Sequence, residues 1–500
     1  MHNSYTFSEF SKQSPKGIFI IYVAEIYRAI KLFWIFLFIL FKDFSKFSSY
    51  GVNYIYLGVV LLLLLLFLRA YLIYINFQYK IAHQHFILKK GILKKTLIEI
   101  PFHRIQNINF KQNIVQQIIG VFEVSIETAG SKDTEIAIKA LSLEKAETLK
   151  ATITQGQKLV NKVVEEENLE PIVKISFFDL LRVSLTENHL QNLFLFFAVV
   201  IGFFNQIQQI SDSFGQSEAL DGYISESTSN LSESIVLVTI LVILLTVIAL
   251  LSSFVKVVLI HFNLSAYLKD DAFEINQGLL TKKSIVLKKQ KIQNVTISTN
   301  PLKRLIGISF ITFKQAVSGK VNNKKKEKLI RLVGCKKQQI EILKKSVFHE
   351  LSVEKSVKQN PDSYYKKILF FWTGLFLLIC YTVIFYFINH IEVFYSLLVI
   401  IPVTTLLLLK KVKKRCYQIS EEMLIVGKGL LETHLTYLDI FKVQHIKIKQ
   451  SIFQKGSNVA DLVLQTASGK IEIPCIAYQE AIKIYNHTLY KVETSNAPWM

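Results

Sequence analysis

Three stretches of the chain repeat one pattern: GILKKTLIEIPFHRIQNI at residues 91–108, GLLTKKSIVLKKQKIQNV at 278–295 and GLLETHLTYLDIFKVQHI at 429–446. Each begins with a glycine and places a glutamine fifteen residues later. A spacing held in three copies is the mark of one supersecondary unit that is used repeatedly. The sequence therefore predicts three copies of a single module.

The shared spacing continues beyond these stretches. Fourteen residues after the glutamine stand Gly120, Gly307 and Asn458. Glycine and asparagine enter left-handed backbone conformations at the lowest cost. Because asparagine is the one replacement, we expect a positive φ angle at this position in every copy.

Each copy reads as short strands followed by a helix. Residues 79–88 are expected to form one half-buried strand that turns at 90–91, because apolar and polar side chains alternate there. Amphipathic helices are expected at residues 142–160, 335–348 and 478–491. A small antiparallel sheet or barrel closed by one helix fits this order.

Apolar blocks precede every copy. A bilayer core of about 30 Å needs about 20 apolar residues in a helix. Six spans are predicted, in three hairpins: 18–41 with 54–77, 190–210 with 235–260, and 368–388 with 393–409. The first half of 18–41 carries Glu25, Arg28 and Lys31, which suits the membrane interface.

The predicted fold class is thus an α+β membrane protein in which helical hairpins alternate with modules. The hairpins belong to residues 1–77, 190–260 and 368–409, and the modules to residues 78–165, 262–352 and 412–492. Apolar residues make up 51% of the 500 residues and are gathered in blocks, which excludes a wholly soluble enzyme and a disordered chain. The four cysteines form no C-x-x-C pair and indicate no disulfide framework.

Charge sets the predicted orientation. The chain carries a net charge of +21, yet the loop at 208–234 has no lysine or arginine. Cytoplasmic loops are the ones enriched in basic residues. We therefore expect a multi-pass protein of the cytoplasmic (inner) membrane, with both termini and all three modules in the cytoplasm.

The motifs of the copies resemble the bacterial pleckstrin-homology-like (PH-like) domain, in the three-module arrangement of YdbT-type membrane proteins. The stretches that carry the resemblance are Arg104-Ile-Gln-Asn-Ile, Lys291-Ile-Gln-Asn-Val and Lys442-Val-Gln-His-Ile, together with the opening glycines. The resemblance covers essentially the whole chain. It implies a membrane-anchored cytoplasmic scaffold that often works beside a smaller single-module PH-like membrane protein, and it does not imply an enzyme.

The repeated motif offers one candidate surface. Its members are Arg104, Gln106, Lys291, Gln293, Lys442 and Gln444. They would form a shared ligand surface in one interpretation. In the other, the motif is a strand whose apolar residues pack inward and whose glutamine bonds neighbouring backbone.

A lysine-rich hairpin offers a second candidate surface. Its members are Lys320, Lys324, Lys325, Lys326, Lys328 and Arg331. Basic clusters are attracted to the anionic inner leaflet, although most charge runs are solvated loops. Nucleic acid is not an expected partner, because no aromatic side chains are interleaved with these lysines for base stacking.

Catalytic motifs are missing from the sequence. It contains no G-x-S-x-G, P-loop, H-E-x-x-H or G-x-G-x-x-G pattern. No catalytic, cofactor-binding or metal-binding residues are therefore predicted, and no cofactor. The expected function is a non-enzymatic scaffold for protein partners or anionic lipid, with the bilayer itself as a partner. The alternative is a small-solute transporter or export-system subunit.

Overall fold

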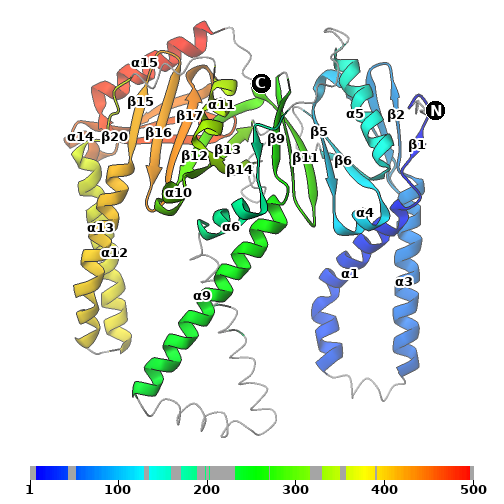
Figure 1. Cartoon of the computed structure of the whole chain (residues 1–500), viewed down its shortest axis with the longest axis horizontal. Coiled ribbons are helices and arrows are strands. Elements are labelled where there is room, and N and C mark those ends of the chain that lie inside the picture. The colour runs from blue at the N-terminus through cyan, green and yellow to red at the C-terminus, as the bar shows by residue number, and fades with distance from the viewer. Residues whose placement is uncertain are drawn as a thin grey trace. The chain divides into compact units, whose positions relative to one another are not determined.

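The computed structural model describes residues 7–42, 52–128, 135–158, 170–187, 198, 202, 231–269, 271–315, 329–348, 356–388 and 391–495 (Figure 1). The chain forms two compact units. The first comprises Met1–Pro171, Ala266–Leu287 and Ser318–Lys320, and the second comprises the remainder. The first three strands of the second copy therefore fall almost wholly in the first unit, and the rest of that copy falls in the second.

The three copies share one order of elements: three strands, a 3-10 turn, a strand, a short helix, two strands and a longer helix. In the first copy these are β2 (Gln78–Ala82), β3 (His85–Lys90), β4 (Thr96–Pro101), η1 (Phe102–Arg104), β5 (Ile105–Gln112), α4 (Ile114–Ile119), β6 (Phe122–Thr128), β7 (Glu135–Leu141) and α5 (Leu143–Lys158).

The other two copies follow the same plan. The second contains β9 (Ser265–Lys269), β10 (Ala272–Gln277), β11 (Lys282–Lys288), η2 (Lys289–Lys291), β12 (Ile292–Thr299), α10 (Pro301–Ile306), β13 (Ile308–Gln315), β14 (Leu329–Lys336) and α11 (Lys337–Val347). The third contains β15 (Cys416–Ile419), β16 (Met423–Gly429), β17 (Thr433–Asp439), η5 (Ile440–Lys442), β18 (Val443–Lys449), α14 (Ile452–Gly456), β19 (Val459–Thr466), β20 (Gly469–Ala477) and α15 (Tyr478–Thr494). The predicted internal repeat and the three closing helices are confirmed.

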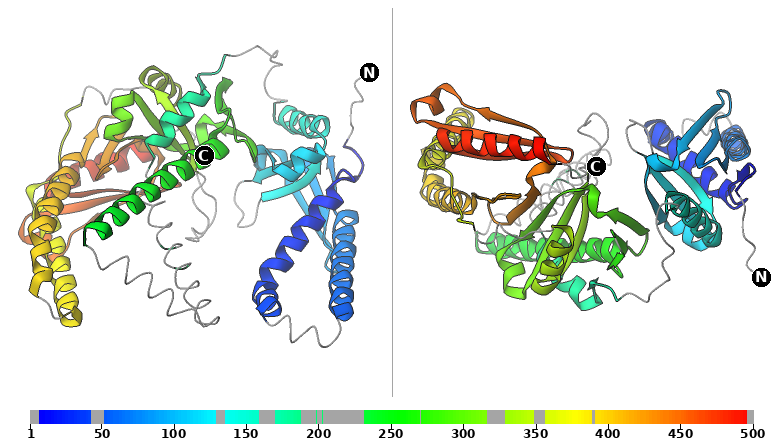
Figure 2. Two further views of the ribbon diagram at one scale, coloured as in Figure 1. Left: turned by 60° about the horizontal axis from the view of Figure 1, so that its bottom comes forward. Right: turned by 90° about the horizontal axis from the view of Figure 1, so that it is seen from above.

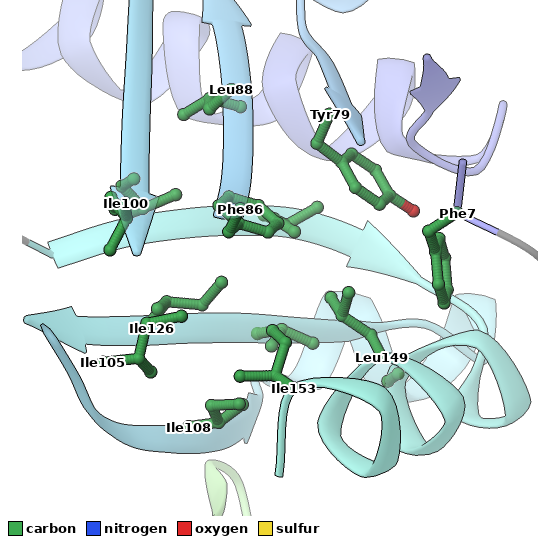
Figure 3. Close-up of a cluster of buried hydrophobic side chains, with 14 of the residues drawn as sticks. Phe7, Tyr79, Phe86, Leu88, Ile100, Ile105, Ile108, Ile126, Leu149 and Ile153 are labelled. Atoms are coloured by element: carbon green, nitrogen blue, oxygen red, sulfur yellow. The ribbon is translucent and has the colours of Figure 1, made fainter. Parts of the chain in front are cut away.

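The first unit encloses a core between two sheets and the helix α5. Tyr79, Phe86 and Ile100 come from the first sheet, and Ile126 and Leu149 reach them from β6 and α5 (Figure 3). All five are fully buried or nearly so, which is where apolar surface contributes most to stability. The first sheet runs β1-β2-β3-β4, where β1 is Ser11–Lys12, and the strands of the second sheet in this unit run β7-β6-β5-β11-β10-β9.

One local expectation was wrong. Residues 79–88 are not one strand, because His83 and Gln84 adopt φ angles of 48° and 59°. Two successive positive φ angles make the tight hairpin turn whose twist matches antiparallel strands. The alternation continues across the turn, so sequence periodicity did not reveal it.

The second unit contains the sheets β14-β13-β12-β17-β16-β15 and β18-β19-β20. The core of the third copy lies between the latter sheet, β15–β17 and α15, with Leu424, Leu438, Leu462 and Ile484 buried in it. Figure 2 shows α15 lying along the strands of this copy. The unit also contains β8 (Val173–Lys174), α6 (Phe177–Leu185) and α9 (Leu231–His261).

Long apolar helices carry the membrane signal. In the described part of the chain, four are long and apolar enough to span a bilayer: Tyr56–Ile75, Ile243–His261, Ser363–Tyr386 and Phe394–Lys414. They belong to α3 (Val52–Ile75), α9, α12 (Ser363–Ile388) and the pair η4 (Ile391–Ser396) and α13 (Leu397–Lys414). Helices α12 and α13 pack side by side (Figure 1). A 2.6 Å hydrogen bond joins the hydroxyls of Tyr381 and Ser396.

The other two predicted spans have different outcomes. Residues 18–41 form the helix α1 (Gly17–Lys42), which is not among the four candidate spans. It packs against α3, where the rings of Tyr22 and Phe67 lie 5.5 Å apart. The third predicted span, 190–210, lies almost wholly outside the described residues. The arrangement as six spans in three hairpins therefore stays a prediction.

Candidate interfaces with the membrane and between modules

The glutamine that the copies share is the extra residue of a β-bulge. In each fourth strand, two residues face one on the neighbouring strand, and the shift brackets Gln106 in β5, Gln293 in β12 and Gln444 in β18. A bulge bends its strand and increases the local twist, and it fixes the register on either side. The repeated spacing is thus explained by backbone geometry without a ligand.

The motif residues do not form three equivalent surfaces. Gln293 is fully buried, whereas Gln444 and Arg104 are exposed. Lys291 is half-buried, and the side chain of Gln106 lies outside the described residues. A ligand role for this set stays a prediction.

Lys442 has a structural role. Its ammonium lies 2.7 Å from the Asp439 carboxylate, three residues earlier in the chain, and donates a 2.9 Å hydrogen bond to the carbonyl oxygen of Ile292. Ile292 belongs to the second copy, so this buried lysine joins the second and third copies within the second unit.

Strand pairing joins the copies. The fourth strand of one copy pairs with the third strand of the next: β5 with β11 in the first unit, and β12 with β17 in the second. Lys282 faces Gln112 in the first pair, and Thr433 faces Thr299 in the second. Lys282 and Thr433 each lie four positions after the opening glycine of their own copy. Gln112 and Thr299 each lie twenty-one positions after the opening glycine of theirs. The two junctions therefore have the same register.

Side chains reinforce the second junction. The hydroxyls of Thr296 and Thr436 lie 3.1 Å apart, and the Ser298 hydroxyl lies 2.7 Å from Nδ1 of His434. The Asn294 amide donates a 2.7 Å hydrogen bond to the hydroxyl of Ser468, and both are buried. Buried polar groups that satisfy one another specify one arrangement of the two copies.

The short helix of one copy also contacts the glycine turn of the next. The Gln117 amide on α4 donates to the carbonyl oxygens of Leu279 and Leu280, at 3.2 and 2.9 Å. In the second unit, Lys303 on α10 forms an ion pair with Glu432 and lies 3.7 Å above the ring of Phe310. Burial lowers the pKa of Lys303, and Glu432 opposes that shift.

The opening glycines are required by the turns themselves. Gly91, Gly278 and Gly429 have φ angles of 113°, 108° and 142°. A Cβ atom on any of them would clash with the carbonyl oxygen three residues later. Each tight turn leaves apolar side chains facing outward, and Leu93 is fully exposed while Leu431 is half-exposed.

In each unit, a glycine turn lies beside the end of a membrane helix. In the first, an open groove of about 830 Å³ separates α3 from the turn, and its lining is mostly apolar but includes Arg69 and Lys90. In the second, the Lys414 ammonium at the end of α13 donates to the carbonyl oxygens of Leu430 and Leu431, at 2.8 and 2.6 Å. We call the two turns 91–93 and 429–431 the membrane-proximal turns.

A charged cluster lies between α1 and α3. The buried Glu25 carboxylate is 2.5 Å from Arg28 and 3.5 Å from Arg69. A buried carboxylate is tolerated when cations pair with it. The cluster fixes the two helices against each other at the end nearest the module.

The lysine-rich hairpin is described at Arg331 alone. Its guanidinium lies 3.4 Å from the Glu187 carboxylate and 4.4 Å from the centre of the Phe310 ring. The five lysines fall outside the described residues. Their role as a lipid site stays a prediction.

No metal-ligand set is found among the described residues, where no group of three or more His, Cys, Asp or Glu side chains is close enough to hold an ion. The thiol of Cys335 is buried, and burial raises its pKa to about 12. A thiol with such a pKa is a poor nucleophile.

The family follows from comparison with known proteins. A model described as the bacterial PH domain matches residues 30–157, 203–355 and 370–492, which is most of the chain. The chain belongs to the bacterial PH domain family. Each matched stretch includes apolar residues ahead of the module as well as the module itself. The resemblance inferred from the glycine and glutamine motifs is confirmed.

A curated relative is similar over most of its length. The UPF0699 transmembrane protein YdbT of Bacillus subtilis (strain 168) is 22% identical over 398 residues, which cover 76% of this chain and 77% of the relative. The similarity supports membrane association for this bacterial PH domain protein.

The sequence did not reveal the pairing between copies, because its motifs describe each copy singly.

Proposed function

We propose that this bacterial PH domain protein is a non-enzymatic scaffold of the cytoplasmic membrane. Its three PH-like modules would face the inner surface and bind protein partners or anionic lipid. The observation that carries the proposal is the position of a membrane-proximal turn beside a membrane helix in each unit.

The composition of the turns supports contact with the bilayer surface. Leu93 and Leu431 expose apolar side chains, while Lys94, Lys95 and Lys414 adjoin them. Apolar side chains flanked by cations are typical of segments that lie in the membrane interface. Each cation near an anionic leaflet contributes about 1 kcal/mol.

Fluorescent labels test the membrane contact. An environment-sensitive dye on Leu93→Cys or Leu431→Cys, in the full chain reconstituted in anionic nanodiscs, should emit at shorter wavelength than in water. The matched control is His103→Cys, an exposed residue that follows the far end of β4. Water-like emission from all three positions would rule out this membrane contact.

The lysine-rich hairpin supplies the lipid arm of the proposal. Energy transfer from a donor on Ser318→Cys to acceptor-labelled phosphatidylglycerol should fall when Lys324, Lys325, Lys326 and Lys328 are changed to Gln. It should also fall with salt, which screens exposed charges over about 10 Å at 0.1 M.

A matched charge change separates this site from general attraction. The control variant changes four exposed lysines elsewhere to Gln: Lys337, Lys345, Lys358 and Lys483. Equal transfer in both variants would leave the hairpin without a lipid role. The membrane-contact experiment would still stand, because it reads different residues.

A further inference from the structure

Each junction between copies uses the fourth strand of one copy and the third strand of the next. Three copies form two such junctions, so one third strand and one fourth strand have no partner from another copy. The third strand of the first copy, β4, is an edge of its sheet, and so is the fourth strand of the third copy, β18. We propose that β18 of one molecule pairs with β4 of a second copy of this chain, repeating the junction seen twice within the molecule.

Burial distinguishes the unpaired strands from their paired counterparts. Gln293 and Asn294 on β12 are buried beside β17, whereas Gln444 and His445 at the same positions of β18 are exposed. On β4, Leu97 is 57% exposed. An unpaired strand edge presents a row of backbone donors and acceptors that is a template for another strand.

The shared register says which residues would meet. It places Thr96 opposite Lys449, and Leu97 opposite Ile448, as Leu435 faces Ile297 in the second junction. Apolar pairs directly opposite one another stabilise antiparallel strands. Pro101 ends β4 beyond the paired stretch, so its missing N–H does not interrupt the ladder.

The surroundings of both edges match the existing junctions. Arg104 is exposed and stands where Lys442 reaches the Ile292 carbonyl, so it would reach the Val443 carbonyl of the neighbouring molecule. On α14, Ile452 and Phe453 are 90% and 80% exposed. The fully exposed Leu93 is in the glycine turn that α14 of the neighbouring molecule would contact.

A second copy is the occupant because the chain carries both halves of the junction. The two paired strands, β18 and β4, are different surfaces of the chain, so the interface is heterologous. Molecules in one bilayer would therefore associate head to tail. This inference does not depend on the lipid or partner proposed above, since its premises are the two strand edges and the residues beside them.

Disulfide cross-linking tests the register. Full-length chains with Cys380→Ser, carrying either Thr96→Cys with one tag or Lys449→Cys with another, are mixed in detergent, reconstituted and oxidised. The remaining native cysteines are buried. We expect a disulfide-linked species that carries both tags. Thr96 and Lys449 are exposed, so neither change disturbs a core.

Leu97→Cys is the matched control, because neighbouring residues of a strand point to opposite faces. Paired with Lys449→Cys, it should cross-link far less. Equal yields from residues 96 and 97 would contradict the register. A chain that carries both Thr96→Cys and Lys449→Cys provides a further check. If its disulfide formed only within single chains, the occupant would not be a second molecule.

Mass measurement tests association directly. The wild-type chain in mild detergent should exceed the mass of one copy in light scattering, and Leu97→Glu should raise the concentration of half-association about threefold or more. Tyr490→Glu, which changes an exposed residue on α15, should leave association unchanged. If the wild-type protein had the mass of one chain at all concentrations, the proposal would be overturned.

Discussion

At the residue scale, the position shared by Gly120, Gly307 and Asn458 is decided by backbone conformation. Their φ angles are 75°, 76° and 53°, as the asparagine replacement predicted. A Cβ atom on Gly120 or Gly307 would have no neighbour within 4 Å, so close packing is not the reason for glycine.

Gly120→Asn should therefore be tolerated in the full chain, whereas Gly120→Val should be costly. A β-branched side chain at positive φ is a steric outlier, with strain on the order of 1–3 kcal/mol. Thermal unfolding of the two variants beside the wild type measures the difference. Equal melting of both variants would contradict a conformational cause.

Lys442 tests whether the repeated motif is structural. Lys442→Met removes a charged donor from the Ile292 carbonyl, so the free energy of unfolding should fall by about 1–3 kcal/mol. Gln444→Ala alters an exposed side chain two residues away and should change it by less than about 0.5 kcal/mol. Denaturant titration of both variants checks this, and the reverse order would contradict a structural role for Lys442.

At the element scale, the pairing of β12 with β17 should weaken in acid. Burial lowers the pKa of His434 below 6.5, helped by Lys428, Lys303 and Arg331 and opposed by Glu432. The folded state then binds fewer protons than the unfolded state, so stability is lost as pH falls through the unfolded pKa.

His434→Gln should flatten this pH dependence. Melting temperatures of the two proteins should differ in their change between about pH 7.5 and about pH 5.5, the range in which an ordinary histidine titrates. The wild type should lose more stability than the variant. Parallel curves would show that His434 does not contribute to the acid sensitivity.

At the scale of the whole molecule, membrane orientation is the open prediction. The cation-free loop at 208–234 should lie outside the cell and the lysine-rich hairpin inside. In a Cys380→Ser background, Ser225→Cys should react with an impermeant thiol reagent in intact cells. Ser318→Cys should react only after lysis, and reversed labelling would contradict a cytoplasmic role for the modules.

Features that depend on short stretches of chain could be predicted from the sequence. Apolar length predicted the four candidate spans, and spacing predicted the repeat, the closing helices and the left-handed positions. These signals are local, because a helix period, a tight turn or a bulge involves only near neighbours.

The tertiary structure alone decided how copies join and which motif residues are buried. Gln293 and Gln444 occupy one position of the motif, yet one is buried and the other is exposed because only β12 has a strand on its outer edge. The pairing was hidden in the sequence for a physical reason. Every strand edge presents the same backbone N–H and C=O groups, and a strand from far along the chain determines which edges are satisfied.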